Sequence, residues 1–138
     1  MTKRWWIVLG IGVVMAGNAA AQACPCAGGN RLNQGQISSL LAGNTVCAVL
    51  GSDRWQEWHN GASFFELGEN FATPDLAGTW SVVGTGSNAT VSYAYAGGST
   101  WAYNVCQDGA NVHFCTATAG GRNVTNATVR AGKASCGF

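Results

Sequence analysis

The sequence predicts a mainly β domain: an eight-strand antiparallel meander that forms a small up-and-down barrel or a strongly twisted sheet, with one short N-terminal helix. From residue 45 onward, apolar and polar residues alternate with a period of two, as in strands that bury one face. Turn-forming pairs such as Asn60-Gly61 and Asp108-Gly109 separate these runs at spacings of about ten residues. Because such short connections make consecutive strands antiparallel neighbours, eight of them can close without a free edge.

The first 23 residues have the pattern of an export signal. A basic start precedes an almost wholly apolar run over residues 5–16, and Ala21-Gln22-Ala23 supplies small residues for cleavage after Ala23 or Ala21. The apolar stretch of about 12 to 15 residues is shorter than the roughly 20 that a membrane-spanning helix needs. We therefore expect a periplasmic or secreted protein without a transmembrane span in the mature chain. Its regions are a signal peptide (1–23), a flexible N-terminal arm (24–32) and a disulfide-stabilised β domain (33–138).

One short helix is expected before the first strand. Asn33 suits an N-cap, and Gln36 three residues later completes a capping-box pattern. The apolar residues that follow share one helical face, and Gly43-Asn44 is a typical helix end. The pattern therefore predicts a helix over residues 33–42.

Eight strands are expected after this helix, at 45–50, 54–59, 62–67, 79–84, 89–96, 100–106, 111–117 and 123–130. A looser connection is expected over residues 68–78, which contain Pro74-Asp75. The alternation places a set of large aromatic side chains on the buried face of the later strands. These are Trp80, Tyr93, Trp101, Tyr103 and Phe114.

All six cysteines follow the predicted signal, which indicates a compartment where disulfides persist. With Asp108-Gly109 as the turn, Cys106 and Cys115 lie about 13 Å apart along the strands, too far for a disulfide. The last strand brings Cys136 back towards Cys106, so the register favours Cys106–Cys136 and leaves Cys115 for Cys47. Cys24 and Cys26 then remain, either paired together, paired with another molecule or binding something else.

Residues 55–66 form the candidate ligand- or partner-binding site. With Asn60-Gly61 as the turn, one face of this hairpin gathers two carboxylates, an imidazole and two aromatic rings. Such a face can grip a polar ligand or a basic side chain of a partner; the alternative is an edge hairpin whose polar residues are merely solvated. The residues are Trp55, Glu57, His59, Phe64 and Glu66.

Composition and spacing argue against other functions. Without residues 1–23 the chain keeps five basic and six acidic residues, so no basic patch is available for nucleic acid. His59 and His113 are isolated, and no close Cys-x-x-Cys or His-x-His spacing is present. We therefore expect no metal, no cofactor and no nucleic-acid partner.

Several motifs carry a resemblance. Thr45-Val46-Cys47, Gly78-Thr79-Trp80-Ser81-Val82 and Phe114-Cys115 together resemble a group of small exported bacterial proteins of unassigned function. This resemblance spans most of the mature chain and implies a bacterial source and a compact β domain, with no particular activity. Gly78-Thr79-Trp80 is also similar to the Gly-x-Trp of lipocalins and avidins, although about 50 mature residues precede it here.

These observations predict a non-enzymatic exported binding module that recognises a protein or envelope ligand through the hairpin of residues 55–66. One alternative is a small-ligand-binding barrel, which requires an apolar cavity. Another is a protein similar to inhibitors of lysozyme or of a protease. A small hydrolase would need His59 or His113 within hydrogen-bond reach of a carboxylate.

Overall fold

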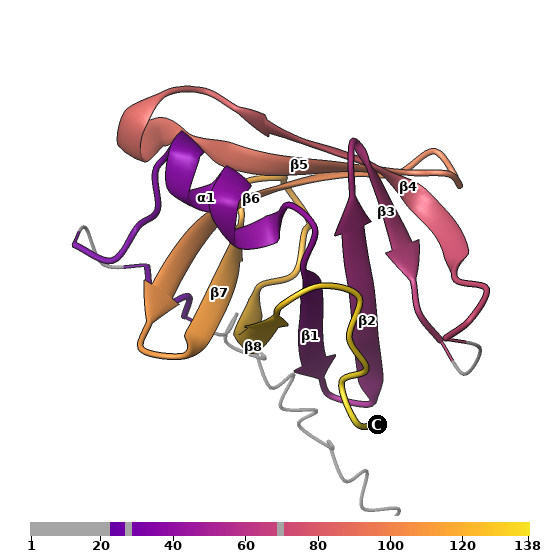
Figure 1. Ribbon diagram of the computed structural model, residues 1–138. Helices are drawn as coiled ribbons and strands as arrows, with labels where there is room; N and C mark the ends of the chain where they lie inside the picture. The colour runs from indigo at the N-terminus through magenta and orange to yellow at the C-terminus, as the bar shows by residue number, and fades with distance from the viewer. Residues whose placement is uncertain (1–22, 27–28, 69–70) are drawn as a thin grey trace, which may run out of the picture.

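The computed structural model describes residues 23–26, 29–68 and 71–138, so nearly all of the predicted signal lies outside the described residues. Eight antiparallel strands form a closed barrel, in which each strand pairs with the next and β8 pairs with β1 (Figure 1). The predicted meander and barrel are therefore confirmed, and the open sheet is excluded. The strands are β1 (Thr45–Leu50), β2 (Asp53–Asn60), β3 (Ser63–Glu66), β4 (Asp75–Val83), β5 (Thr90–Tyr95), β6 (Thr100–Asp108), β7 (Asn111–Thr116) and β8 (Val124–Arg130).

The predicted helix is α1 (Gln34–Leu41). The Asn33 side chain accepts a hydrogen bond from the Gln36 N–H, and the Gln36 side chain accepts one from the Asn33 N–H. This confirms the capping box. Because the chain up to Asn33 precedes it, the helix begins the barrel domain and does not stand at the N-terminus as expected. Within the three described ranges, no helix has the length and apolar character needed to cross a membrane.

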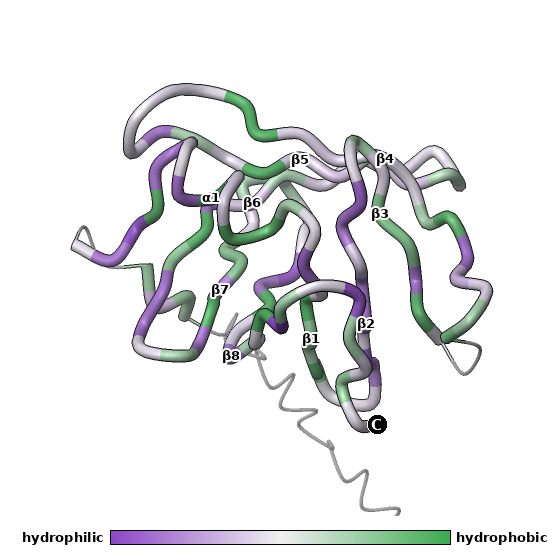
Figure 2. Tube along the Cα trace, in the orientation of Figure 1, coloured by the Kyte–Doolittle hydropathy of each residue, from purple (hydrophilic) through white to green (hydrophobic). Residues whose placement is uncertain are grey.

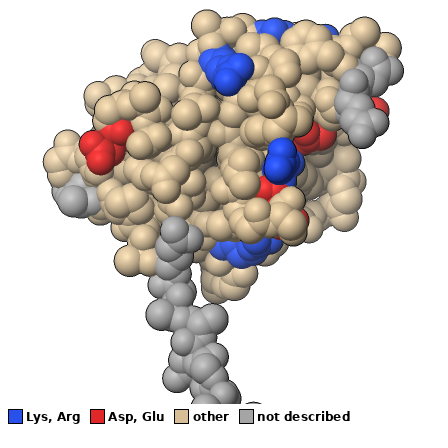
Figure 3. Space-filling model, turned by 90° about the horizontal axis from the view of Figure 1, so that it is seen from below, with Lys and Arg blue, Asp and Glu red and all other residues tan. Residues whose placement is uncertain are grey.

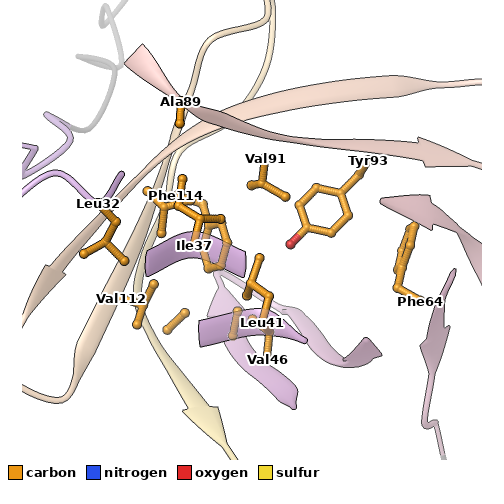
Figure 4. Packing of buried hydrophobic residues seen from close by; sticks show 13 residues of the cluster. Leu32, Ile37, Leu41, Val46, Phe64, Ala89, Val91, Tyr93, Val112 and Phe114 are labelled. Carbon is orange, nitrogen blue, oxygen red and sulfur yellow. The ribbon is translucent and has the colours of Figure 1, made fainter. Parts of the chain in front are cut away.

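α1 closes the end of the barrel at which β1 begins. Ile37 and Leu41 are fully buried, and both point into a cluster of side chains from the surrounding strands (Figure 4). Each such side chain contributes about 1.5–3 kcal/mol through removal of apolar surface from water. Their strand partners include Val91, Val112 and Phe114. The solid core therefore occupies the helix end of the barrel.

The hairpin turns begin one residue later than the turn motifs predict. β2 and β3 pair Asn60 with Ser63, so the turn is Gly61-Ala62 and the expected Asn60-Gly61 turn is wrong. The β6–β7 turn is shifted in the same way, to Gly109-Ala110. In both turns the glycine has positive φ, 59° and 57°. Positive φ at the first central position alone is the pattern of a type II′ turn. The shift changes cross-strand partners by two residues and keeps every side chain on its predicted face.

β4 begins at Asp75, within the stretch predicted as a loose connection. Pro74 precedes the strand, where its missing N–H costs no ladder hydrogen bond. Gly78, read from the sequence as part of the connection, lies inside β4 opposite Phe64. A Cβ atom at Gly78 would overlap the Ala94 carbonyl oxygen and come within 2.9 Å of the Phe64 ring. The glycine therefore makes room for a buried aromatic ring.

The disulfides join Cys24 to Cys115, Cys26 to Cys106 and Cys47 to Cys136. The expected Cys106–Cys136 and Cys47–Cys115 pairs are therefore wrong, and Cys24 and Cys26 are not left over. The expectation that Cys106 and Cys115 do not pair with each other is confirmed. Strand register predicted the wrong partners because one cysteine of each disulfide lies outside the strands, on the N-terminal arm or on the C-terminal tail.

The first of these segments is the N-terminal arm, which runs beside β6. The Leu32 N–H donates to the Val105 carbonyl at 2.8 Å, and the Gln107 N–H donates to the Asn30 carbonyl at 3.0 Å. The Arg31 side chain also donates to the Asn104 side-chain oxygen. These contacts bring the arm cysteines to the outward-facing cysteines of β6 and β7.

The second segment is the C-terminal tail, which folds back over the outside of β1 and β2. The Thr45 hydroxyl donates to the Gly132 carbonyl at 2.7 Å. The Cys136 N–H donates to the Gln56 side-chain oxygen, also at 2.7 Å. These contacts explain why Cys47 and Gln56 are buried although they face away from the barrel interior.

A non-reducing tryptic digest tests this connectivity, because the basic residues divide the cysteines among different peptides. We expect peptide 32–54 linked to peptide 134–138 through Cys47–Cys136. Peptide 55–122 should carry both bonds to the N-terminal cysteines. Mass spectrometry reads the linked masses, and a 55–122 peptide linked to 134–138 would restore the Cys106–Cys136 pairing.

Substitution of Gly78 tests the packing of β4. We expect Gly78→Ala to lower the free energy of unfolding by about 1–3 kcal/mol, because the added methyl group would overlap the Ala94 carbonyl and overpack the Phe64 contact. Gly97→Ala is the matched control, since a Cβ atom there meets nothing within 4 Å. Urea titration of both variants gives the comparison, and equal stabilities would contradict the described packing.

Candidate functional site

The five predicted site residues lie on the inner side of the β2–β3 hairpin. Across the two strands Glu57 faces Glu66, and His59 faces Phe64. Glu57, His59 and Phe64 are buried, while Trp55 and Glu66 are half-buried. The structure therefore brings the five residues onto one face, and this face is part of the barrel interior. It is not an exposed edge.

β2 is unusually polar for a strand of a small barrel. It is visibly more hydrophilic than β1 beside it (Figure 2). Acidic side chains are almost never fully buried unless they are paired, because burial removes their hydration. Glu57, with 9% of its surface exposed, is therefore an exception to the usual distribution. Such local exceptions concentrate at functional sites.

An interior cavity of about 330 Å³ lies beside Glu57. It occupies the end of the barrel opposite α1, where the β1–β2, β3–β4, β5–β6 and β7–β8 connections meet; we call this end the mouth. Buried Val46 and Ala48 of β1 form an aliphatic part of the wall. Most of the remaining wall is aromatic. Its rings belong to Trp55, Tyr93, Tyr95, Trp101, Tyr103 and Phe114.

Edge-to-face contacts hold the aromatic wall in place. Tyr103 packs against Tyr93 and Phe114 with ring centroids 6.1 Å apart in each pair. Phe64 packs against Tyr95 at 5.0 Å. Contacts of this kind add about 0.5–1.5 kcal/mol per pair beyond area burial. The large aromatic rings predicted on the buried face of the later strands thus surround a space. Trp80 is the exception, because it packs instead against His59 at 5.1 Å.

His59 is a neutral side chain that connects the β2 backbone to Tyr93 of the cavity wall through hydrogen bonds. Its Nδ1 lies 3.2 Å from the Glu57 backbone carbonyl, which can only accept, so Nδ1 carries the proton. Its Nε2 lies 3.0 Å from the Tyr93 hydroxyl and accepts from it. Burial lowers the pKa of His59 to about 4, because the surroundings disfavour the imidazolium form. This histidine therefore fixes the position of the Tyr93 side chain.

Glu57 is the titratable group of the cavity. Burial, and then the nearby Glu66 carboxylate, raise the pKa of Glu57 to about 7. The Tyr95 hydroxyl donates to Glu57 Oε1 at 3.2 Å and partly opposes this rise. Burial also raises the pKa of Glu66, whose carboxylate accepts from the Gln56 N–H. The site thus offers a carboxyl group that changes charge near neutral pH.

The mouth carries one further charged pair. Arg122, from the β7–β8 connection, donates to Asp53 at 2.9 Å, and both side chains are exposed. Figure 3 views the barrel from the side of the β1–β2 turn and shows only scattered charged side chains on that face. The guanidinium is therefore balanced by a neighbour outside the cavity, while the cavity itself is mostly apolar.

The remaining candidates of the sequence have structural roles. His113 Nδ1 accepts the Asn126 N–H at 3.1 Å, where β8 bulges and Asn126 takes a positive φ of 58°. The sulfur atoms of Cys24, Cys26 and Cys115 lie within 4.8 Å of one another. Because all three are oxidised in disulfides, they are not metal ligands in this state.

Sequence reasoning missed the partners that complete the site. The alternation places Tyr103 on the buried face, but nothing in the sequence pattern indicates that Tyr103 and Tyr95 lie beside Glu57. Arg122 sits in a glycine-rich connection and carries no periodic signal. The available signal was register: β2 must meet β5 and β6 across the interior once the meander closes.

The pH dependence of the free energy of unfolding tests the raised pKa of Glu57. Because its folded-state pKa of about 7 exceeds the ordinary 4.5, the folded protein binds the proton more tightly and loses stability as pH rises between these values. The free energy of unfolding of Glu57→Gln, taken relative to that of wild type, should therefore increase by roughly 2 kcal/mol between pH 5 and pH 8. The opposite contribution of His59 is common to both proteins and cancels. Urea titrations at the two pH values measure the difference, and a constant difference would contradict the assignment.

Comparison with known proteins identifies no family. No family model, no curated protein and no solved structure matches this chain. The resemblance to small exported bacterial proteins therefore stays a prediction. What the site does must follow from its own geometry.

Proposed function

We propose that the protein is an exported, non-enzymatic binding barrel that holds a small, mostly apolar molecule in its interior. The cavity beside Glu57 is the observation that carries this proposal. Its volume of about 330 Å³ falls in the range of about 300–1,000 Å³ typical of small-molecule sites. An aromatic wall with a single convergent carboxyl group also fits the usual composition of such sites.

Burial of the hairpin face favours a small ligand over a protein partner. Glu57, His59 and Phe64 are at most 9% exposed, so a flat protein surface cannot reach them. A molecule that enters the mouth can contact Trp55 and Trp101, which are half-buried, and then the deeper rings. The small-ligand alternative raised by the sequence is therefore preferred to recognition of a protein.

Two further observations support an exported protein without an assembled catalytic group. Three disulfides are typical of proteins that work in the periplasm or outside the cell. Among the described residues, neither His59 nor His113 hydrogen-bonds to a carboxylate. A hydrolase built on either histidine therefore lacks its main support.

Filling the cavity tests the proposal. Ala48 is 4% exposed and lines the cavity, so the indole of Ala48→Trp should occupy the ligand space. We expect wild type to bind the neutral dye N-phenyl-1-naphthylamine saturably, with increased dye fluorescence. Ala48→Trp should weaken this binding at least tenfold because dye and indole compete for one volume.

Ala94→Trp is the matched control, since Ala94 is exposed on β5 and points away from the interior. It should bind the dye as wild type does. Circular dichroism of both variants checks that the barrel is folded. Equal dye affinity in Ala48→Trp, or no saturable binding by wild type, would refute a ligand site in the barrel.

A further inference from the structure

Glu57 stands beside an aromatic cavity without a basic partner. Its carboxyl group accepts a hydrogen bond from Tyr95, and Glu66 across the strand pair brings a second acidic group close by. Among the residues that the structure describes, the one ion pair joins Arg122 to Asp53. Neither interior carboxylate is therefore neutralised by a side chain of its own. A buried carboxylate in this state favours a cation that enters the cavity.

The rings around Glu57 favour the same kind of ligand. The faces of Trp and Tyr carry negative potential, so they attract ammonium groups within about 6 Å of the ring centroid. Trp55, Tyr95 and Tyr103 line the cavity together with the Glu57 carboxyl group. Resting on the ligand-binding function proposed above, we infer that the cavity takes a small organic ammonium ion. Its charged nitrogen lies against Glu57, and its apolar body lies among the aromatic rings.

The geometry disfavours other charged ligands. A metal ion such as Ca²⁺ needs six to eight oxygen ligands, whereas this lining is mostly aromatic and aliphatic. An anion would meet Glu57 in the cavity, and Arg122, the cationic residue of the cavity lining, is already paired with Asp53 at the exposed rim. An ammonium ion with a hydrocarbon body matches both the acidic group and the apolar wall.

Ligand binding should then be coupled to the proton of Glu57. Burial and Glu66 raise the Glu57 pKa to about 7, and a cation at the carboxylate favours the ionised form. Affinity should therefore rise between pH 5.5 and pH 8, with release of up to one proton. Glu66 adds to this direction, because its pKa is also raised. Titratable and charged groups face Glu57 from several surrounding elements. They are Glu66 of β3, Tyr93 and Tyr95 of β5, Tyr103 of β6 and Arg122 of the β7–β8 connection. His59 is the next residue of β2 on the same face.

A pair of probes of equal size tests the inference. Tryptamine and tryptophol share the indole ring and side-chain length, and differ in an ammonium group against a hydroxyl group. Isothermal titration calorimetry of the full mature protein at pH 8 should show tryptamine binding at least tenfold more tightly. At pH 6.5, tryptamine binding in buffers of different ionisation enthalpy should reveal proton release, and tryptophol binding should not.

Glu57→Gln should reduce the preference for tryptamine to less than twofold and abolish the proton release. Asp108→Asn is the matched control, because it removes one exposed carboxylate at the opposite end of the barrel, and it should keep the tenfold preference. Equal or tighter binding of tryptophol by wild type would overturn the cation inference, as would dye binding that neither probe displaces. If the neutral dye also fails to bind, the ligand-binding function itself fails.

Discussion

The interior of this protein depends on the closure of the barrel at β1. This strand pairs with β2 over six residue pairs, from Thr45–Trp58 to Leu50–Asp53, but with β8 over only three. The short seam is reinforced from outside, because the C-terminal tail bonds to the Thr45 hydroxyl and is fixed to Cys47 by a disulfide. Closure leaves the sheet without a free edge, so the polar face of β2 has no route to solvent except through the mouth. The buried carboxyl group follows from this constraint.

The sequence predicted the fold well where the signal is local. Alternation identified all eight strands, and the Asn33–Gln36 pattern identified the helix start, because both depend on residues close in the chain. Turns were less well placed, since Asn-Gly and Asp-Gly pairs suit more than one turn type and Gly61 took the first central position instead of the second. The predicted disulfide pairing was wrong because one cysteine of each bond lies on the N-terminal arm or the C-terminal tail. Hydrophobic periodicity does not predict the path of such irregular segments.

For the site, the sequence predicted which residues share a face but not on which side of the sheet that face lies. Glu57 and His59 resemble solvent-facing residues in composition, and an open hairpin would expose them. Only the closed topology decides the matter, by facing β2 towards the tyrosines of β5 and β6. The local preference for solvent and the global requirement for burial thus conflict at Glu57. The conflict is resolved by one hydrogen bond from the Tyr95 hydroxyl, and by a raised pKa that lets the Glu57 carboxyl group remain protonated.

The three disulfides span 91, 80 and 89 residues of chain, so each joins an early segment to a late one. During vectorial synthesis the amino-terminal cysteines emerge first and have no native partner until β6 and β7 have formed. Covalent locking by these two bonds is therefore a late event, which comes after β6 and β7 have formed. Until then Cys24 and Cys26, separated by one proline, are each other's nearest thiols. Any Cys24–Cys26 bond formed in that interval must be undone by thiol–disulfide exchange before the pairs with Cys115 and Cys106 can form.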